Sequence, residues 1–462
     1  MSIEGLLRTL DKAHSGPVCT VKEWNMKVIP RLTQQKLKEH GLQKTFDSNN
    51  PINTDDGLAD EFYKAGFELA IEMGVICQET ERVIKVSEEE LLEGIRSAPS
   101  ELVLGYGEDR VVVRPRRPED KLKPLMIAPT AVAFSEDMYI KFTQAVAQYR
   151  EIDIMEGASL TTLFGRPVLA GTPYETLLGR YEAELKKEAL WRAGRPGMPT
   201  LGVSSSPTEY GQFGGFGTVG GLDPSFNLAL ILLPGEMMTH YPALHKIAHT
   251  INCGGKISMG LDHMIGGYSG PPEGAALTEV ANWLLQFPLH QAHAINGAAI
   301  DVRYFGMCGR EGQWTHSVAT QAISRNTHLL GMYMQHQVGG PGTEMLLYEG
   351  AVTMMQLSAS GAAGGFGSRS SGSKYPEHLT PLECKFCAEV LKGSAGMTRQ
   401  QVNEIAKILI PRYEQMLKTP PKGKSFTELY DLKTLQPKKE WLDVYLRVKK
   451  ELIDFGVPVQ YP

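Results

Sequence analysis

The sequence predicts an α/β fold of the (β/α)8 TIM barrel type, with helical N-terminal and C-terminal extensions. From Met126 onward, short apolar segments that end in Gly, Pro or Ser alternate with helical stretches. This alternation is typical of parallel β/α units. Six or more such units fall within about 250 residues, the usual length of a closed barrel. A doubly wound open sheet is the alternative.

Residues 1–125 are expected to form a helical cap with a small β element, packed on the barrel. Residues 61–75, EFYKAGFELAIEMGV, carry apolar side chains at helical spacing. Residues 82–86 (RVIKV), 101–107 (ELVLGYG) and 110–116 (RVVVRPR) have the β-branched content of short strands. The last two would be joined by a turn at Gly107, Glu108 and Asp109.

The barrel itself is assigned to residues 126–390. Its expected strands are PLMIAPTAV, IDIMEGASL, TLGVSSSP, LALILLPG, KISMGLDH and AAIDVRYFG. Between them, YETLLGRYEAELKKEALWRAG repeats apolar residues every three or four positions and ends at a glycine, as an amphipathic helix does. Residues 391–462 form a charged C-terminal helical extension that closes with EWLDVYLRVKKELIDFG. Because no low-complexity linker divides the chain, we expect one structural domain overall.

Charge and segment composition exclude several classes of protein. The formal net charge of −5 provides no basic field for a nucleic-acid backbone. The N-terminus lacks the basic start and apolar run of a signal peptide, and no apolar stretch is long enough to cross a membrane. Six scattered cysteines do not form a disulfide framework. We therefore expect a cytoplasmic protein with reduced thiols and neither a nucleic-acid nor a membrane partner.

Barrel enzymes carry their reacting groups where the strands end, so polar residues at those points are the catalytic candidates. Asp262 and His263 follow KISMGL, and Gln335 and Gln337, on either side of His336, precede VGGPGTEM. We take Asp262, His263, Gln335 and Gln337 as candidate catalytic residues. Asp301, after AINGAAI, is a candidate substrate-binding residue. A structural polar role is the alternative for each.

Aromatic residues flank the same loops and the glycine-rich runs at 211–221 and 360–373. They are Tyr210, Phe213, Phe216, Tyr268, Trp314 and Tyr333. Aromatic faces attract a methylated ammonium ion, which makes these residues candidates for substrate binding. Packing within the core is the alternative for each of them.

Metal binding is not expected. Cys384 and Cys387 form a single C-x-x-C pair without a second pair to complete a zinc site. Nine histidines between His240 and His336 could supply ligands, yet His245 and His249 lie on a helical stretch where packing is the common outcome. A zinc site built from the barrel histidines stays open as an alternative.

Several longer motifs resemble the monomethylamine:corrinoid methyltransferases of methylotrophic methanogens. They include AGFELAIEMGVICQETERVIKVSEEEL, VRPRRPEDKLKP, TPYETLLGRYEAELKKEALWRAGRPGM, GGYSG, GPGTEMLLYE and GKSFTELYDLKTL, collinear over nearly the whole chain. The resemblance implies a (β/α)8 barrel, a homo-oligomer and transfer of a methyl group to Co(I) of a separate corrinoid protein. No cofactor would be tightly bound, since the corrinoid (cobalamin) would arrive on that partner.

One departure from the family shapes the functional hypothesis. The resemblance implies a pyrrolysine directly after AGRPGM, where the imine would capture the amine, and this chain has Pro199 there. A proline offers no electrophile, so the methyl donor would need its own positive charge. We therefore expect a pyrrolysine-independent methyltransferase acting on a quaternary or otherwise activated methylated amine, with Pro199 among the substrate-binding residues. The alternatives are a non-catalytic relative that binds a small molecule or the corrinoid protein, and a zinc-dependent enzyme acting on an O- or S-methyl donor.

Overall fold

Eight parallel strands close into a barrel in the computed structural model, which describes residues 2–130 and 132–460. The strands in chain order are β5 (Leu125–Ala128), β7 (Ile154–Met155), residues 200–201, β11 (Leu228–Leu232), β13 (Lys256–Ile265), β14 (Ala294–Asp301), β15 (Met332–Met334) and β16 (Gly364–Phe366). The predicted (β/α)8 barrel is confirmed, and the open-sheet alternative is wrong because β16 pairs in parallel with β5.

Closure of the barrel depends on short bridges as well as on long ladders. The order β15-β16-β5-β7 forms one hydrogen-bonded run and β11-β13-β14 forms another. The short third strand lies between β7 and β11, which it joins through the parallel bridges Met155↔Thr200 and Leu201↔Leu228. A further parallel bridge, Ile295↔Gly331, joins β14 to β15. Every strand therefore has two neighbours, and the sheet has no free edge.

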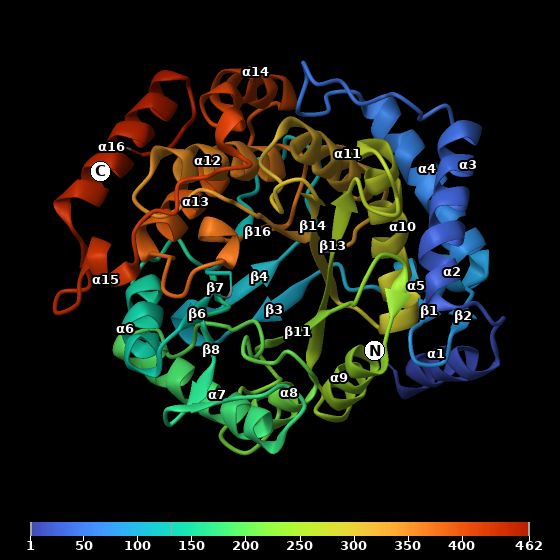
Figure 1. Cartoon of the computed structure of the whole chain (residues 1–462), viewed down its shortest axis with the longest axis horizontal. Coiled ribbons are helices and arrows are strands. Elements are labelled where there is room, and N and C mark those ends of the chain that lie inside the picture. The colour runs from blue at the N-terminus through green and yellow to red at the C-terminus, as the bar shows by residue number, and fades with distance from the viewer. Residues whose placement is uncertain (1, 131, 461–462) are drawn as a thin grey trace.

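A helix follows each barrel strand, and the helices form the outer ring seen in Figure 1. In order they are α6 (Glu136–Ala147), α7 (Pro173–Arg192), α8 (Tyr210–Gly215), α9 (Tyr241–Asn252), α10 (Pro272–His290), α11 (Arg310–Asn326), α12 (Glu344–Ala359) and α13 (Pro381–Gly393). Small paired strands decorate the loops: β6 (Ala133–Phe134) with β8 (Ser159–Leu160), and β9 (Thr162–Leu163) with β10 (Arg166–Pro167).

The N-terminal extension covers the outside of α10 and α11. It contains α1 (Ile3–Ser15), α2 (Val21–Glu23), a π-helix (Trp24–Val28), α3 (Ile29–Glu39), α4 (Asp56–Met73), β1 (Val75–Cys77), β2 (Arg82–Ile84) and α5 (Glu88–Ser97). The helix α4 packs on α10 and α11, and β1 pairs with β12 (Met238–Thr239) from the barrel loops. In Figure 1 these helices form one flank of the molecule.

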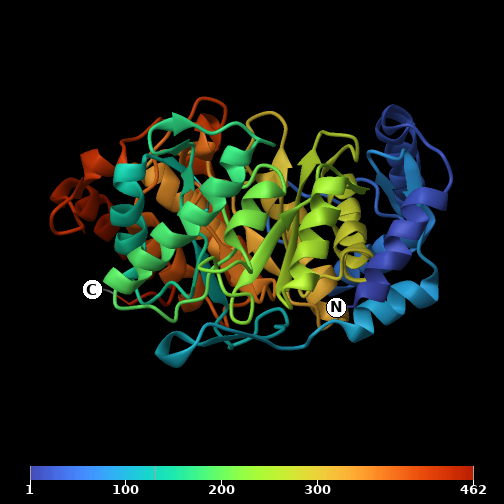
Figure 2. The same ribbon diagram turned by 90° about the horizontal axis from the view of Figure 1, so that it is seen from below.

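A hairpin closes the end of the barrel opposite the loops that follow the strands. β3 (Leu102–Leu104) and β4 (Val111–Val113) pair antiparallel, joined by a 3-10 turn at Gly107–Asp109 where the sequence predicts a turn. Figure 2 shows this segment crossing beneath the barrel. The Gly197 Cα lies so close to the Tyr106 carbonyl that an added Cβ would be 2.2 Å from its oxygen, so this contact requires glycine.

The C-terminal extension packs on α12 and α13. It comprises α14 (Arg399–Leu409), two 3-10 turns (Ile410–Arg412 and Glu414–Met416), α15 (Phe426–Leu429), β17 (Tyr430–Asp431), β18 (Gln436–Pro437) and α16 (Lys439–Asp454). The buried Trp441 donates from Nε1 to Thr380 Oγ1 at 2.9 Å, which fixes α16 at the start of α13.

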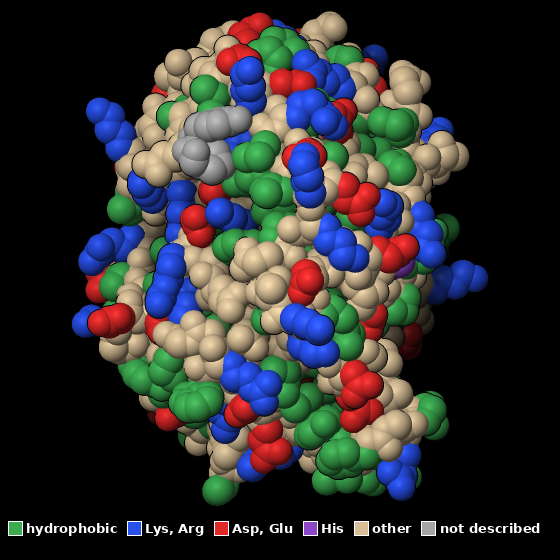
Figure 3. Space-filling view, turned by 90° about the vertical axis from the view of Figure 1, so that its left-hand side faces the viewer, with side chains coloured by type: hydrophobic (Ala, Val, Ile, Leu, Met, Phe, Trp, Pro, Cys, Tyr) green, Lys and Arg blue, Asp and Glu red, His purple; other side chains and the backbone are tan. Residues whose placement is uncertain are grey.

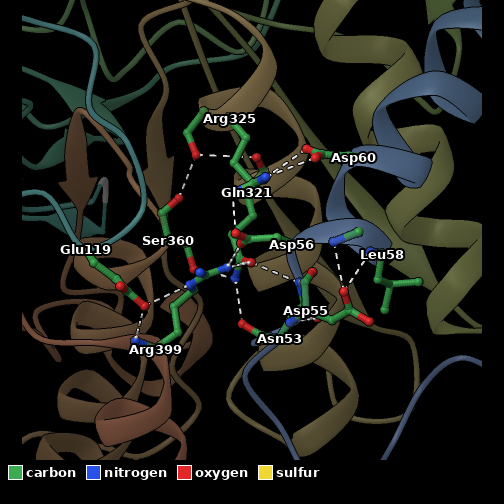
Figure 4. A network of polar contacts seen from close by, with 12 residues as sticks. Asn53, Asp55, Asp56, Leu58, Asp60, Glu119, Gln321, Arg325, Ser360 and Arg399 are labelled. Carbon is green, nitrogen blue, oxygen red and sulfur yellow. Dashed lines mark hydrogen bonds and ion pairs between the residues drawn. The ribbon is translucent and has the colours of Figure 1, made fainter.

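Arg399 ties the C-terminal extension to the N-terminal one and to the barrel (Figure 4). Its Nη1 donates to Asp56 Oδ1 at 2.7 Å and to Gln321 Oε1 at 2.9 Å, and its Nε donates to Glu119 Oε1 at 3.1 Å. Gln321 in turn bonds to the backbone oxygen and the side chain of Asn53. One largely buried guanidinium therefore joins three segments distant in sequence.

We expect Arg399→Met to lower the free energy of unfolding by about 2 kcal/mol, because Asp56, Glu119 and Gln321 lose a charged donor together. Urea unfolding followed by circular dichroism measures the change. Arg447→Met, which breaks the exposed Arg447–Glu344 pair, is the matched control and should cost less than about 0.5 kcal/mol. Equal losses in the two variants would contradict the role given to Arg399.

The surface carries charges of both signs. On the face shown in Figure 3, Lys and Arg side chains lie among Asp and Glu side chains and neither sign dominates. Among residues 2–130 and 132–460, no helix combines the length and the apolar content that crossing a membrane requires.

Candidate active site

The loops that follow the barrel strands enclose a cavity of about 380 Å³ on one side of the barrel mouth. Its lining is Glu156, Ser159, Leu160, Val203, Ser204, Ser205, Ser206, Pro207, Leu230, Leu232, His240, Pro242, Ala243 and Lys246. Carboxylate, hydroxyl, imidazole and ammonium groups share this lining with leucine side chains. The cavity therefore offers a small ligand both charged and apolar contacts.

Asp262 extends from β13 into the mouth of the barrel. Its Oδ2 lies 3.1 Å from His336 Nε2, and 28% of the side chain is exposed. Its Oδ1 is buried and has no hydrogen-bond partner among the described residues. Burial raises the pKa of this carboxyl group above its ordinary value. A carboxylate oxygen without a partner at the mouth favours the binding of a cation or a hydrogen-bond donor there.

His336 and Arg369 complete the polar cluster around Asp262. The Arg369 guanidinium contacts the His336 ring and also donates from Nε to Ser373 Oγ at 3.0 Å. Burial lowers the pKa of Arg369, and the negative charges of Asp262 and Glu156 act against that shift. The two carboxylates therefore lie within electrostatic reach of a single guanidinium.

His263 lies on the other side of the same strand. Successive residues of a strand point to opposite faces, so Asp262 faces the mouth while His263 faces α10. His263 is fully buried, neither ring nitrogen has a partner among the described residues, and burial lowers its pKa to about 3. The structure separates this candidate from the mouth.

Gln335 and Gln337 also point away from the mouth, while His336 between them points into it. Gln335 Nε2 donates to Cys387 Sγ in α13 at 3.1 Å, and Gln337 Nε2 donates to the Leu346 carbonyl in α12 at 2.8 Å. Gln337 Oε1 accepts from the Arg369 backbone N–H at 3.1 Å. The two glutamines thus connect the barrel to its outer helices, and Gln337 also helps to position Arg369.

Asp301 ends β14 with its carboxylate already satisfied. Arg303 donates to Asp301 from its backbone N–H at 2.8 Å and from Nε to both carboxylate oxygens, at 2.8 and 3.0 Å. Glu311 holds the same guanidinium at 2.8 Å. Because this network occupies the Asp301 carboxylate, the structure gives it no free oxygen for a substrate.

The six candidate aromatic residues do not converge on one cavity. Trp314 packs edge-on against Phe46 and Phe62 of the N-terminal extension, at 5.6 and 5.9 Å between ring centroids. Tyr333 stacks behind β15 on Trp283 at 4.5 Å. The aromatic cage that the sequence suggested is therefore absent from this arrangement.

The other four rings lie in three separate places. Tyr210 and Phe213 pack edge-to-face on each other within α8, Phe216 is buried in a small cluster with Leu222 and Ala229, and Tyr268 is 46% exposed in the loop after β13. None of these rings lines the cavity described above.

Pro199 lies directly before the third barrel strand, on the side away from the loops that line the cavity. Its carbonyl accepts from the Met155 backbone N–H at 2.9 Å, and its ring approaches Gly105 of the hairpin that closes the opposite end of the barrel. Val203 to Ser206, at the other end of this strand, line the cavity. The structure therefore gives Pro199 no contact with a ligand in the mouth.

Comparison with known proteins agrees with the motifs in the sequence. The sequence profile described as "Monomethylamine methyltransferase MtmB" matches residues 5–457. The chain belongs to this family. Monomethylamine methyltransferase MtmB of Methanosarcina mazei is 30% identical over 448 residues, 97% of either chain, and MtmB3 of Methanosarcina barkeri is 31% identical over 449 residues, again 97% of either chain.

Solved structures of the monomethylamine methyltransferase family have the same fold as this chain. The crystal structure of Methanosarcina barkeri MtmB superposes with a TM-score of 0.94 at 29% identity, covering 98% of each chain. A crystal structure of the hydroxylamine complex of MtmB gives the same values. The family match shows that the chain is a methyltransferase, and the structural match shows the barrel fold. Both extend over nearly the whole chain.

Four residues of the site are not among the candidates that the sequence predicts. Glu156, His336 and Arg369 face the mouth, and Lys246 lines the cavity from α9. The sequence places His336 at a strand end. Side chains alternate between the two faces of a strand, so knowledge of the pairing register would have put His336 on the opposite face from Gln335 and Gln337. Glu156 follows a two-residue strand, and Arg369 and Lys246 lie in a loop and on a helix, where no local pattern marked them.

Among the described residues, no three His, Cys, Asp or Glu side chains are grouped closely enough to hold a metal ion. Cys384 and Cys387 are free thiols buried in α13, where Cys387 accepts the hydrogen bond from Gln335. The zinc-dependent alternative has no support from this arrangement.

Glu349 holds the loop after β15 from the outer side of the barrel. Its carboxylate accepts from the Gly339 and Val338 backbone N–H groups at 2.8 and 3.2 Å, and burial raises its pKa to about 8. Between its unfolded pKa, about 4.3, and pH 8, the folded state therefore binds more protons than the unfolded state. This group makes the free energy of unfolding fall as pH rises through that window, with no further change above it.

We expect Glu349→Gln to make this pH dependence shallower by up to about 1.4 kcal/mol per pH unit between pH 5 and 8. Urea unfolding at three pH values in that interval measures the slope. Glu344→Gln alters an exposed carboxylate on the same helix and should keep the slope of the unmodified protein. An unchanged slope in Glu349→Gln would show that Glu349 is ionised in the folded protein throughout.

Proposed function

We propose that this enzyme transfers a methyl group from a positively charged methylated amine to Co(I) of a separate corrinoid protein, without pyrrolysine. The observation that carries the proposal is the unpartnered Oδ1 of Asp262 at the barrel mouth, beside His336. Methylamine as the substrate of the relatives supports an amine donor.

The chemistry requires a nitrogen that leaves as a neutral amine. The electron pair of Co(I) attacks the methyl carbon, the C–N bond breaks, and its electrons return to the nitrogen. The products are methyl-Co(III) and an amine with one methyl group fewer. A quaternary or protonated nitrogen satisfies this balance by itself. The Asp262 carboxylate would bind and orient that cation, so that catalysis depends on positioning and on the complementary charge of the site.

The donor nitrogen is held by charge in this proposal, because the aromatic residues expected to surround it lie elsewhere. Arg369 and His336 keep the Asp262 carboxylate in place, while Glu156 contributes the second negative charge. The corrinoid would arrive on a partner protein at the open mouth. A homo-oligomer and a cytoplasmic location stay predictions from the sequence.

Spectroscopy of the methyl acceptor tests the proposal. The protein is mixed with a reduced corrinoid protein and mono-, di-, tri- or tetramethylated ammonium salts, and the conversion of Co(I) to methyl-Co(III) is followed by absorbance. We expect conversion with charged methyl donors. Donors that bind without any conversion would contradict the proposal and favour the non-catalytic binding relative.

A further inference from the structure

The cavity beside the mouth is much larger than a simple methylamine requires. On the same measure a cavity needs about 10–15 Å³ to hold one water molecule, and this cavity encloses about 380 Å³. Asp262 lies outside this lining, so a methylated ammonium group bound at Asp262 would leave the cavity to the rest of the donor molecule. The side chains that line the cavity therefore indicate which chemical groups the rest of the donor molecule carries.

Lys246 presents an ammonium group to this cavity from the first half of α9. Its Nζ donates to the Ser206 carbonyl at 3.0 Å, and it has no ion pair with a carboxylate among the described residues. An ammonium group has three N–H donors, so donors remain after that single bond. Lys246 thus places in the cavity a positive charge that is not neutralised by an ion pair with a described carboxylate.

His240 also lines the cavity, as the N-cap residue of α9 six positions before Lys246. Its Nδ1 is buried and has no hydrogen-bond partner among the described residues, and burial lowers its pKa. A neutral imidazole with a protonated Nδ1 donates to an anion without carrying charge. Lys246 and His240 together provide donors suited to a carboxylate.

The cavity therefore has opposite charges at its two sides. Glu156 lies on the barrel wall, whereas Lys246 and His240 lie on the helix wall. Leu232, also in the lining, approaches Gly260, where an added Cβ would be 2.9 Å from its Cδ2. Gly260 precedes Asp262 by two residues on the same face of β13, so the cavity adjoins the strand that carries Asp262.

We infer that the methyl donor is a zwitterion, an N-methylated amino acid whose carboxylate is bound by Lys246 and His240 while Asp262 binds its nitrogen. This inference rests on the proposed function and names the substrate class of the same site. An apolar or purely cationic donor would leave Lys246 without an ion pair. An α-amino acid carries both a nitrogen for Asp262 and a carboxylate for Lys246, a few bonds apart.

The protonation of Lys246 sets the pH range of this contact. Burial lowers its pKa to about 8, and the carboxylates of Glu175 and Glu209 act in the opposite direction. His240 and Glu156 are the other titratable groups that line the cavity. The carboxylate-dependent part of binding should therefore weaken as pH rises above 8.

Calorimetric titration tests the inference without a corrinoid partner. The intact protein is titrated with N-methylglycine, N,N-dimethylglycine and trimethylglycine, and with the matching N-ethyl compounds, in which a methyl group replaces the carboxylate. We expect at least one carboxylate donor to bind about tenfold or more tightly than its isostere, as one charge-assisted contact would give. Equal affinities, or no binding by any carboxylate donor, would overturn the inference.

Two lysine variants locate the effect. Lys246→Met should reduce the preference for the carboxylate to within about twofold, and Lys246→Arg should retain part of it, because its charge remains. Lys256→Met is the matched control: Lys256 Nζ also donates to a backbone carbonyl, that of Ser225, but lies outside the cavity. A preference that survives Lys246→Met would also overturn the inference.

Methyl transfer is measured separately with the same compounds and the reduced corrinoid protein. Selective binding of carboxylate donors without methyl-Co(III) formation would support the subsite and contradict the proposed function. Methyl transfer from the N-ethyl compounds at the same rate and affinity would support the function and contradict the subsite.

Discussion

Asp262→Asn should lower the rate of methyl transfer to Co(I) by at least about 100-fold, because it removes the charge that holds the donor nitrogen. An amide can still accept from His336 Nε2, so the variant keeps the nearby hydrogen bond at 3.1 Å and the shape of the mouth. Single-turnover absorbance of the cobalt centre measures the effect at saturating donor. The Kd of the donor, from calorimetry, should rise in the same variant.

Asp301→Asn is the matched control for this prediction. Asp301 ends the neighbouring strand β14, and its carboxylate is held by Arg303. We expect methyl transfer to change by no more than about threefold once unfolding curves show that the variant is folded. Similar rates for Asp262→Asn and the unmodified protein would contradict the role of Asp262.

Lys186→Met should lower the free energy of unfolding by about 3–5 kcal/mol, the usual cost of leaving one member of a buried ion pair alone. Lys186 and Glu182 in α7 are fully buried, with Nζ 3.1 Å from Oε1. Lys186 Nζ also donates to the Gly202 carbonyl, and Glu182 accepts from the Ser204 backbone N–H at 2.8 Å. The pair therefore holds the loop that lines the cavity as well as the helix.

Arg192→Met tests whether burial is the reason for that effect. Arg192 pairs with Glu188 at the same i, i+4 spacing on the same helix, with both side chains about half exposed. Its loss should cost less than about 0.5 kcal/mol by urea unfolding. If Lys186→Met were as mild as Arg192→Met, the buried pair would not stabilise the loop.

The barrel could be predicted because its signal is repeated along the chain. Each unit combines an apolar segment with an amphipathic helix, as in residues 228–252, and an error in one unit leaves the others intact. The third strand was predicted over residues 200–207, whereas only residues 200–201 pair in the barrel. A strand this short has no measurable period of its own, and its neighbours hold it in place.

The site could be predicted only to within one residue on each strand. Asp262 and His263 are adjacent, as are Gln335, His336 and Gln337. A shift of one residue in the strand register would turn the side chains that face the mouth toward the outer helices, and the reverse. The end of each strand can be predicted from the sequence, but the pairing register determines which side chain points into the site. The same limit applies to Glu156, which follows the two-residue strand β7.

The positions of the aromatic residues could not be predicted from the sequence, for a different reason. Trp314 packs on Phe62 from α4, and Tyr333 on Trp283 from α10. These packing partners come from distant parts of the chain. The position of an aromatic residue near a glycine-rich loop in the sequence therefore does not predict which residues it packs against. Pro199 does not reach the mouth, because the residues before a barrel strand and those after it lie at opposite ends of the barrel.

The most direct test of the proposed function is a count of products in a single turnover. The protein is mixed with the reduced corrinoid protein and one charged N-methyl donor, then quenched, and methyl-Co(III) and the demethylated amine are quantified. Methyl transfer through this site predicts equal amounts of the two products, and both should fall together by at least about 100-fold in Asp262→Asn when the reaction is quenched early. Loss of Co(I) without the demethylated amine, or equal yields in that variant, would contradict it.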